Sequence, residues 1–71
     1  MSGNRGVEEL VVDLIRDEYD GLISKYILEG HLLYTFNLKP SRVYRVIMGL
    51  ELDEIIEGFD GNDGEYYRLV G

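Results

Sequence analysis

The chain has 71 residues, a formal net charge of −7 and no cysteine. A chain of this length forms one small domain, which buries only about 60% of the surface that the unfolded chain exposes. The lack of cysteine excludes disulfide bonds and thiolate metal sites, and it is compatible with a reducing compartment. No apolar run approaches the roughly 20 residues of a membrane-spanning helix. We therefore expect a soluble, cytoplasmic protein.

Two helices are expected near the start of the chain, after a polar lead-in of residues 1–6 that we predict to be flexible. The first helix runs from Val7 to about Tyr19 and ends at Asp20-Gly21. Its apolar stripe consists of Val7, Leu10, Val11, Leu14 and Ile15. A second, short helix is predicted from Leu22 to Glu29, ending at Gly30. It would bury Leu22, Ile23, Tyr26 and Ile27.

The segment HLLYTFNL, residues 31–38, leaves three structures open. Its β-branched and aromatic residues favour a short strand, but an extended connector or another helical turn fits as well. Pro40 then starts a helix that runs to about Leu52 or Asp53. The apolar stripe of this helix consists of Val43, Val46, Ile47 and Leu50.

The C-terminal part predicts a β-hairpin. Residues 55–59 and 65–70 are strand-like, and the turn-forming sequence DGNDG lies between them. Together, the elements of residues 7–71 predict a single α+β domain. In this fold, two or three short helices pack on a small antiparallel hairpin or sheet.

Residues 38–70 resemble the second half of a winged-helix domain. The resemblance rests on Pro40-Ser41-Arg42-Val43, on LELDEIIE over residues 50–57, and on Tyr67-Arg68-Leu69. It implies that residues 40–52 form a recognition helix and that the hairpin forms the wing, in a family whose members bind DNA, RNA or proteins.

Two features depart from the family pattern. Glu54 occupies the place of the usual glycine, so the left-handed residue of that corner is expected to be missing or displaced. The first half of the chain maps only loosely onto the family's first helix, strand and second helix. A different packing of a hairpin on two or three helices therefore stays open.

Neither catalysis nor metal binding is expected. His31 is the one histidine of the chain, and its place beside Gly30 is typical of a capping or surface residue. The acidic turn at residues 60–65 resembles a calcium loop, but an EF-hand needs glycine at position 6 and glutamate at position 12. Here these positions hold Glu65 and Gly71. No catalytic residue, metal ligand or cofactor is assigned.

Charge divides the chain into three blocks. Residues 1–30 carry a net charge of −4, residues 31–50 carry +3 without any acid, and residues 51–71 carry −6. On the first helix Glu9, Asp13 and Asp17 recur about every 6 Å, opposite the apolar stripe. Such a row resembles the charge of a phosphate backbone, which would attract a basic DNA-binding protein. The predicted partner-binding acids are Glu9, Asp13, Asp17, Asp20, Glu51, Asp53, Glu54, Glu57, Asp60, Asp63 and Glu65.

The basic block supports a different interpretation. Lys39, Arg42 and Arg45 recur at every third residue near the start of the predicted recognition helix. There they could contact phosphates or guanine edges in the major groove. Against this, DNA-binding domains are usually basic, and an acidic wing would be repelled by the DNA backbone. Alternatively, Arg42 and Arg45 pair with the surplus of carboxylates.

The sequence therefore favours a non-enzymatic DNA mimic that occupies the DNA-binding surface of a basic host protein, HU-like or similar. In size and acidity the chain resembles phage-encoded inhibitors of this type, which act in the host cytoplasm as monomers or homodimers. The alternative is a winged-helix transcriptional regulator that binds DNA through residues 40–52. A third possibility is an adaptor that docks through an exposed apolar patch, and salt would distinguish it because charge-driven binding weakens with ionic strength.

Overall fold

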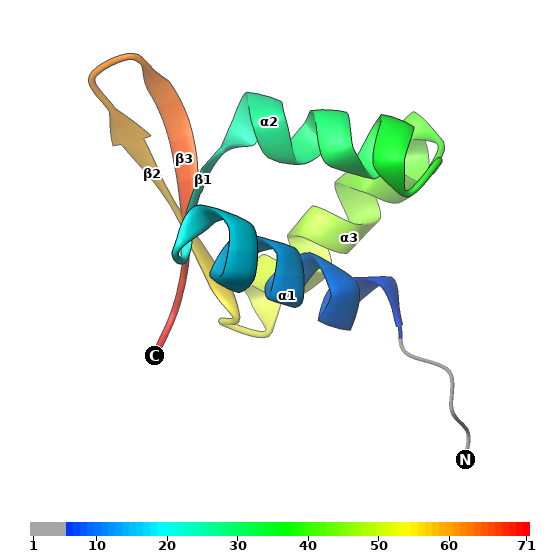
Figure 1. The fold of residues 1–71 in the computed structure, drawn as a ribbon, viewed down its shortest axis with the longest axis horizontal. Helices are drawn as coiled ribbons and strands as arrows, with labels where there is room; N and C mark the ends of the chain where they lie inside the picture. The colour runs from blue at the N-terminus through cyan, green and yellow to red at the C-terminus, as the bar shows by residue number, and fades with distance from the viewer. Residues whose placement is uncertain (1–5) are drawn as a thin grey trace.

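A computed structural model describes residues 6–71 as an α+β domain with a three-stranded antiparallel sheet. In chain order the elements are α1 (Val7–Tyr19), β1 (Leu22–Ser24), α2 (Lys25–Gly30), the π-helical turn η1 (His31–Thr35), α3 (Pro40–Leu52), β2 (Ile56–Gly61) and β3 (Gly64–Leu69). The sheet stands at one end of the long axis, and the three helices extend from it towards the other end (Figure 1). The predicted flexible lead-in lies outside the described residues, apart from Gly6.

The predicted α+β class is confirmed. A helix, a strand and a second helix precede α3 and the hairpin. The strand order β1-β3-β2 places the last strand in the centre of the sheet. Tyr67 of β3 lies between Ile23 of β1 and Gly58 of β2 in the register.

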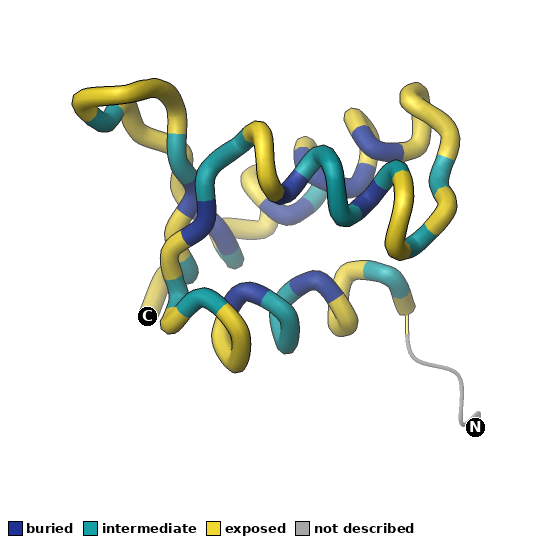
Figure 2. The backbone as a smooth tube through the Cα atoms, turned by 45° about the horizontal axis from the view of Figure 1, so that its top comes forward, coloured by how far each residue is buried: buried dark blue, intermediate teal, exposed yellow. Residues whose placement is uncertain are grey.

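One hydrophobic core joins the sheet to the helices. Its buried residues are Val11, Ile15, Ile23, Leu28, Leu32, Val43, Val46, Ile47, Leu50, Ile56 and Tyr67. They lie on the sides of α1, α2 and α3 that face one another and on the adjoining side of the sheet (Figure 2). Each strand places one residue in this core, Ile23, Ile56 and Tyr67, and the residue after Ile56 and the residue after Tyr67 are exposed, as expected of a sheet with one solvated face.

The two long helices and the hairpin agree with the predictions. Helix α1 ends at Tyr19, and Asp20 follows in the left-handed conformation with φ 55°. Helix α3 begins at Pro40 and buries all four residues of its predicted stripe. The stripe of α1 is less complete, because Val11 and Ile15 are buried whereas Leu10 is exposed.

The predicted second helix starts too early, whereas α2 ends at Gly30 as expected. Residues 22–24 form strand β1, and α2 begins at Lys25 because the hydroxyl of Ser24 accepts a hydrogen bond from the Ile27 amide at 3.1 Å. This later start changes which face is buried. Of the predicted core residues Leu22, Ile23, Tyr26 and Ile27, Ile23 is buried, whereas the other three are exposed and Leu28 enters the core instead.

The helical interpretation of residues 31–38 is correct for residues 31–35, and the strand interpretation is wrong. Gly30 has helical dihedral angles, so the chain continues into η1 instead of stopping. His31 Nε2 lies 2.7 Å from the hydroxyl of Tyr19, and its Nδ1 lies 3.2 Å from the hydroxyl of Thr35. His31 is the C-cap residue of α2, as its place beside Gly30 predicts, and its side chain also connects α1 to η1.

The expectation for the corner between α3 and β2 is wrong. The left-handed residue is neither missing nor displaced, because Glu54 itself has φ 59°. Its amide donates to the carbonyl of Glu51 at 3.0 Å, and the Ile55 amide donates to Leu50 at 2.9 Å. These bonds satisfy carbonyls at the end of α3, so the corner is held although a non-glycine residue makes it.

Replacing Glu54 with glycine is expected to raise the free energy of unfolding by about 0.5–1 kcal/mol. A left-handed conformation costs a non-glycine residue roughly 1–2 kcal/mol, and glycine avoids this cost. Part of the gain in stability is lost, because glycine has more conformational freedom in the unfolded chain. Urea unfolding followed by circular dichroism measures the change. The control is Glu18→Gly in the last turn of α1, which removes the same charge but lowers stability, because glycine is a poor helix former. Equal losses in both variants would contradict the prediction.

Candidate functional site

Three shallow hollows meet at Glu51, in the last turn of α3. One, of about 430 Å³, lies between α2 and α3 and also contains Glu29. A second, of about 280 Å³, lies against the hairpin and contains Asp60 and Glu65. The third, of about 530 Å³, contains Glu54 and Glu57. We call the six carboxylates of these hollows the Glu51 surface: Glu29, Glu51, Glu54, Glu57, Asp60 and Glu65.

A glycine in β2 makes room for Glu51 beside the hairpin. A Cβ atom at Gly58 would lie 3.3 Å from Oε2 of Glu51 and 3.2 Å from the ring of Tyr67. Both distances are tighter than ordinary van der Waals contact, so a side chain there would push Glu51 or Tyr67 away. The acidic end of α3 therefore packs directly against the strand because residue 58 has no side chain.

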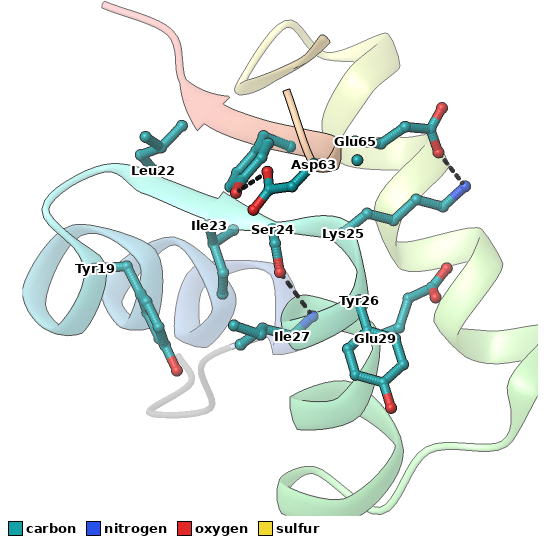
Figure 3. Close-up of a pocket in the computed structure, with 12 residues that line it drawn as sticks. Tyr19, Leu22, Ile23, Ser24, Lys25, Tyr26, Ile27, Glu29, Asp63 and Glu65 are labelled. Atoms are coloured by element: carbon teal, nitrogen blue, oxygen red, sulfur yellow. Dashed lines mark hydrogen bonds and ion pairs between the residues drawn. The ribbon is translucent and has the colours of Figure 1, made fainter. Parts of the chain in front are cut away.

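The hairpin places two further acids face to face. Asp60 on β2 is the direct cross-strand neighbour of Glu65 on β3, and like charges in this position are destabilising. Lys25, at the start of α2, reduces the repulsion, because its Nζ lies 3.0 Å from Oε1 of Glu65. Figure 3 shows Lys25 reaching across to Glu65, with Glu29 on the same side of α2.

Cations are few on the Glu51 surface, and those present are already paired. Among the described residues that line the three hollows, Lys25 is the one cation. Arg68 lies beside them, where its Nη2 is 3.1 Å from Oε1 of Glu57 and its guanidinium lies over the ring of Phe59. The hydrogen bond to Glu65, together with the charge of that carboxylate, raises the pKa of Lys25. The six carboxylates therefore outnumber the two cations, and the surface keeps a net negative charge.

The pKa values of two tyrosines in this region are raised by burial, by hydrogen bonding and by nearby negative charge. Burial raises the pKa of Tyr67, and the nearby charge of Glu51 adds to the effect. The hydroxyl of Tyr66 donates to Oδ1 of Asp63 at 2.7 Å, and this hydrogen bond raises the pKa of Tyr66. Asp63 is thereby engaged at the hairpin turn and does not line the three hollows around Glu51.

The acids of α1 form a separate group. Arg16 lies between Asp13 and Asp17, at 2.7 Å and 3.0 Å from their carboxylates. Its hydrogen bond to Asp17, followed by that to Asp13, raises the pKa of Arg16. The predicted row of carboxylates on this helix is thus partly neutralised by its own cation.

The remaining predicted acids lie outside the Glu51 surface. Glu9 and Asp13 line a hollow of about 390 Å³ together with Glu8, Val12 and Ile55 of the α3–β2 corner. Asp20 and Asp53 are exposed and follow the last residues of α1 and α3.

The predicted basic residues lie at the other end of α3. Lys39, Arg42 and Arg45 are exposed, and within residues 6–71 none of the three forms an ion pair or a side-chain hydrogen bond. The suggestion that Arg42 and Arg45 pair with the surplus carboxylates is therefore wrong for the described part of the chain. In Figure 1 the start of α3 and the tip of the hairpin lie towards opposite ends of the long axis.

One carboxylate of the Glu51 surface was not predicted. Glu29 belongs to the acidic first block of the sequence, but no motif distinguishes it there. Its i, i+4 spacing from Lys25 suggests a simple ion pair on one helix. The structure instead directs Lys25 to Glu65, which leaves Glu29 at the hollow next to α3.

The described residues hold no cluster of candidate metal ligands. Among residues 6–71 no three His, Asp or Glu side chains are grouped as metal ligands. Across the same range, no helix is long and apolar enough to cross a membrane.

Comparison of the chain with protein-family models, with curated proteins and with solved structures gives no match.

Proposed function

We propose that the protein is a non-enzymatic binding protein that uses the Glu51 surface to occupy the DNA-binding surface of a basic protein, HU-like or similar. The observation that carries the proposal is the gathering of six carboxylates from α2, α3 and the hairpin, where the two cations are already ion-paired. A partner rich in Lys and Arg would find unpaired carboxylates there, as it finds phosphates on DNA.

The arrangement has costs that a basic partner would relieve. Asp60 and Glu65 repel each other across the hairpin. Glu51 and Glu54 lie at the C-terminal end of α3, where the helix dipole disfavours negative charge. Stability alone would favour Lys or Arg at these positions. Contact with a positively charged surface would add attractions that offset both unfavourable interactions.

The same surface argues against the mode of DNA binding that the winged-helix resemblance implies. In that mode α3 and the hairpin approach the duplex together, and here their shared surface is acidic. Phosphates would meet Glu51, Asp60 and Glu65 without a free cation between them.

A second candidate function is DNA binding through the start of α3. It is favoured by the exposure of Lys39, Arg42 and Arg45 and by their lack of ion pairs within residues 6–71. Along the helix, residue 51 is about 18 Å from residue 39 and about 9 Å from residue 45, against a Debye length of roughly 8 Å at physiological salt. Salt therefore screens the acidic end from Lys39 more than from Arg45, and net charge alone does not exclude this function.

Titrations with two ligands distinguish the candidates. The labelled protein is titrated with an HU-type protein and, separately, with duplex DNA, each at about 50 and 200 mM salt. We expect it to bind the HU-type protein, to be displaced by DNA and to lose affinity steeply at the higher salt. Direct binding to DNA would overturn the proposal in favour of the second candidate. An affinity that is the same at both salt concentrations would indicate an adaptor that docks through an apolar patch.

A charge-reversal variant provides the control. Changing Lys39, Arg42 and Arg45 to glutamate should leave binding to the HU-type protein unchanged or stronger, because these residues lie away from the Glu51 surface. If the second candidate is correct, the same variant loses its affinity for DNA.

A further inference from the structure

The hollow between α2 and α3 has an apolar floor. Val43, Ile47 and Tyr67 line it and belong to the buried core, and Leu33 of η1 lies beside them. Its volume of about 430 Å³ lies within the roughly 300–1,000 Å³ of clefts that hold small ligands. The space is therefore sufficient for one long side chain of a partner.

The rim of the hollow is aromatic and acidic. Tyr44 and Met48 of α3 flank it, with 65% and 39% of their surfaces exposed. Glu29 of α2 and Glu51 of α3 also line it. Within residues 6–71 neither carboxylate forms an ion pair or a hydrogen bond, and the ammonium group of Lys25, which also lines the hollow, is bound to Glu65. An apolar floor thus lies beneath two unpaired negative charges.

We propose that this hollow receives an arginine side chain of the basic partner, with its aliphatic stem on Val43 and Ile47 and its guanidinium between Glu29 and Glu51. The inference rests on the proposed function and assigns one anchoring contact within it. An arginine stem buries well on apolar surface while its head stays polar. The planar guanidinium carries five donors, which suit two carboxylates, and it stacks on aromatic rings such as Tyr44.

Other occupants fit the chemistry less well. A phosphate group would be repelled by Glu29 and Glu51. A purely apolar side chain would cover these two carboxylates without replacing their contact with water, which is costly. Charge complementarity therefore selects a cationic side chain with an aliphatic stem.

A peptide titration tests the inference. The probe is a capped ten-residue alanine–glycine peptide with one central arginine, and the matched probe carries citrulline, which has the same shape without the charge. Methyl signals of Val43, Ile47 and Met48 are followed by NMR. We expect saturable shifts with the arginine peptide and none with the citrulline peptide. Equal shifts with both peptides, or none with either, would refute the arginine site.

Two variants and a control test whether Glu29 and Glu51 bind the arginine side chain. Glu29→Gln and Glu51→Gln are each expected to weaken binding of the arginine peptide roughly tenfold, as for other hydrogen bonds to charged groups. Glu18→Gln on α1 removes the same charge and is expected to leave binding unchanged. Equal weakening by all three variants would show that net charge, and not the hollow, attracts the peptide.

The HU-type titration separates the two proposals. If wild-type protein and the Glu29→Gln variant bind the HU-type protein equally well, the arginine site is wrong and the proposed function stands. If the arginine peptide fills the hollow but the HU-type protein does not bind, the arginine site stands and the proposed function is wrong.

Discussion

Replacing Leu50 with alanine is expected to lower the free energy of unfolding by about 3 kcal/mol. Leu50 lies in α3, and none of its surface is exposed. The substitution removes buried methyl groups and leaves a cavity that a small core cannot close. At roughly 0.05–0.15 kcal/mol per residue, a domain of this size has a total stability of about 4–10 kcal/mol. The loss is therefore about 30% of the total or more, and urea unfolding measures it.

Leu52→Ala is the matched control for this prediction. Leu52 lies two residues further along the chain, and 76% of its surface is exposed. The same chemical change there is expected to alter stability by less than about 0.5 kcal/mol. Similar losses in both variants would mean that α3 does not pack on the core through Leu50.

Neutralising four carboxylates of the Glu51 surface is expected to weaken binding to the basic partner roughly ten- to a hundredfold. The variant combines Glu51→Gln, Glu54→Gln, Glu57→Gln and Asp60→Asn. Exposed ion pairs contribute little individually, so the effect is expected to accumulate and no single substitution should abolish binding. Titration with the HU-type protein at low salt measures the affinity.

The control neutralises four acids elsewhere: Glu8→Gln, Asp17→Asn, Glu18→Gln and Asp20→Asn. Both variants have the same net charge, so equal losses would show that the Glu51 surface has no special role. Stability provides a second check. Removing negative charge near the C-terminal end of α3 relieves its conflict with the helix dipole. We therefore expect the Glu51 surface variant to be at least as stable as the wild type, which excludes unfolding as the cause of weaker binding.

The elements predicted well from the sequence are those with strong local signals. Helix α1 has an apolar stripe and ends at Asp20-Gly21, whereas α3 has Pro40 at its first position and a complete stripe. In the hairpin, turn-forming residues stand between two strand-like segments. Each of these signals lies within about a dozen residues, so no knowledge of distant contacts is needed.

The features that the sequence did not predict depend on contacts between residues far apart in the chain or on backbone conformations fixed by packing. Strand β1 has three residues, and its identity comes from pairing with residues 66–68. Gly30 looked like a helix end, but Leu28 and Leu32 on either side of it are both buried, which favours continuing the helix. Glu54 adopts the left-handed conformation because the end of α3 and the start of β2 are both fixed by packing.

The sequence indicates which segments are acidic. It does not indicate which of their carboxylates lie close together in the fold. Glu51 meets Asp60 and Glu65 because the hairpin folds back on α3, and Gly58 lets the carboxylate approach. Glu29 joins them because α2 starts at Lys25. These coincidences follow from tertiary packing, whereas the charge blocks of the sequence indicate only which segments are acidic.

The central position of β3 has a consequence for how the chain folds during synthesis. Both β1 and β2 pair with β3, and β1 precedes it by more than 40 residues. The helices can form as they leave the ribosome, but no part of the sheet can form until residues 64–69 emerge. Pairing β1 with β3 then brings together two segments that are far apart in the chain. The entropy lost in this step slows folding. We therefore expect cooperative folding to begin only after β3 has been made, and nascent chains that stop before residue 64 to remain open to proteases.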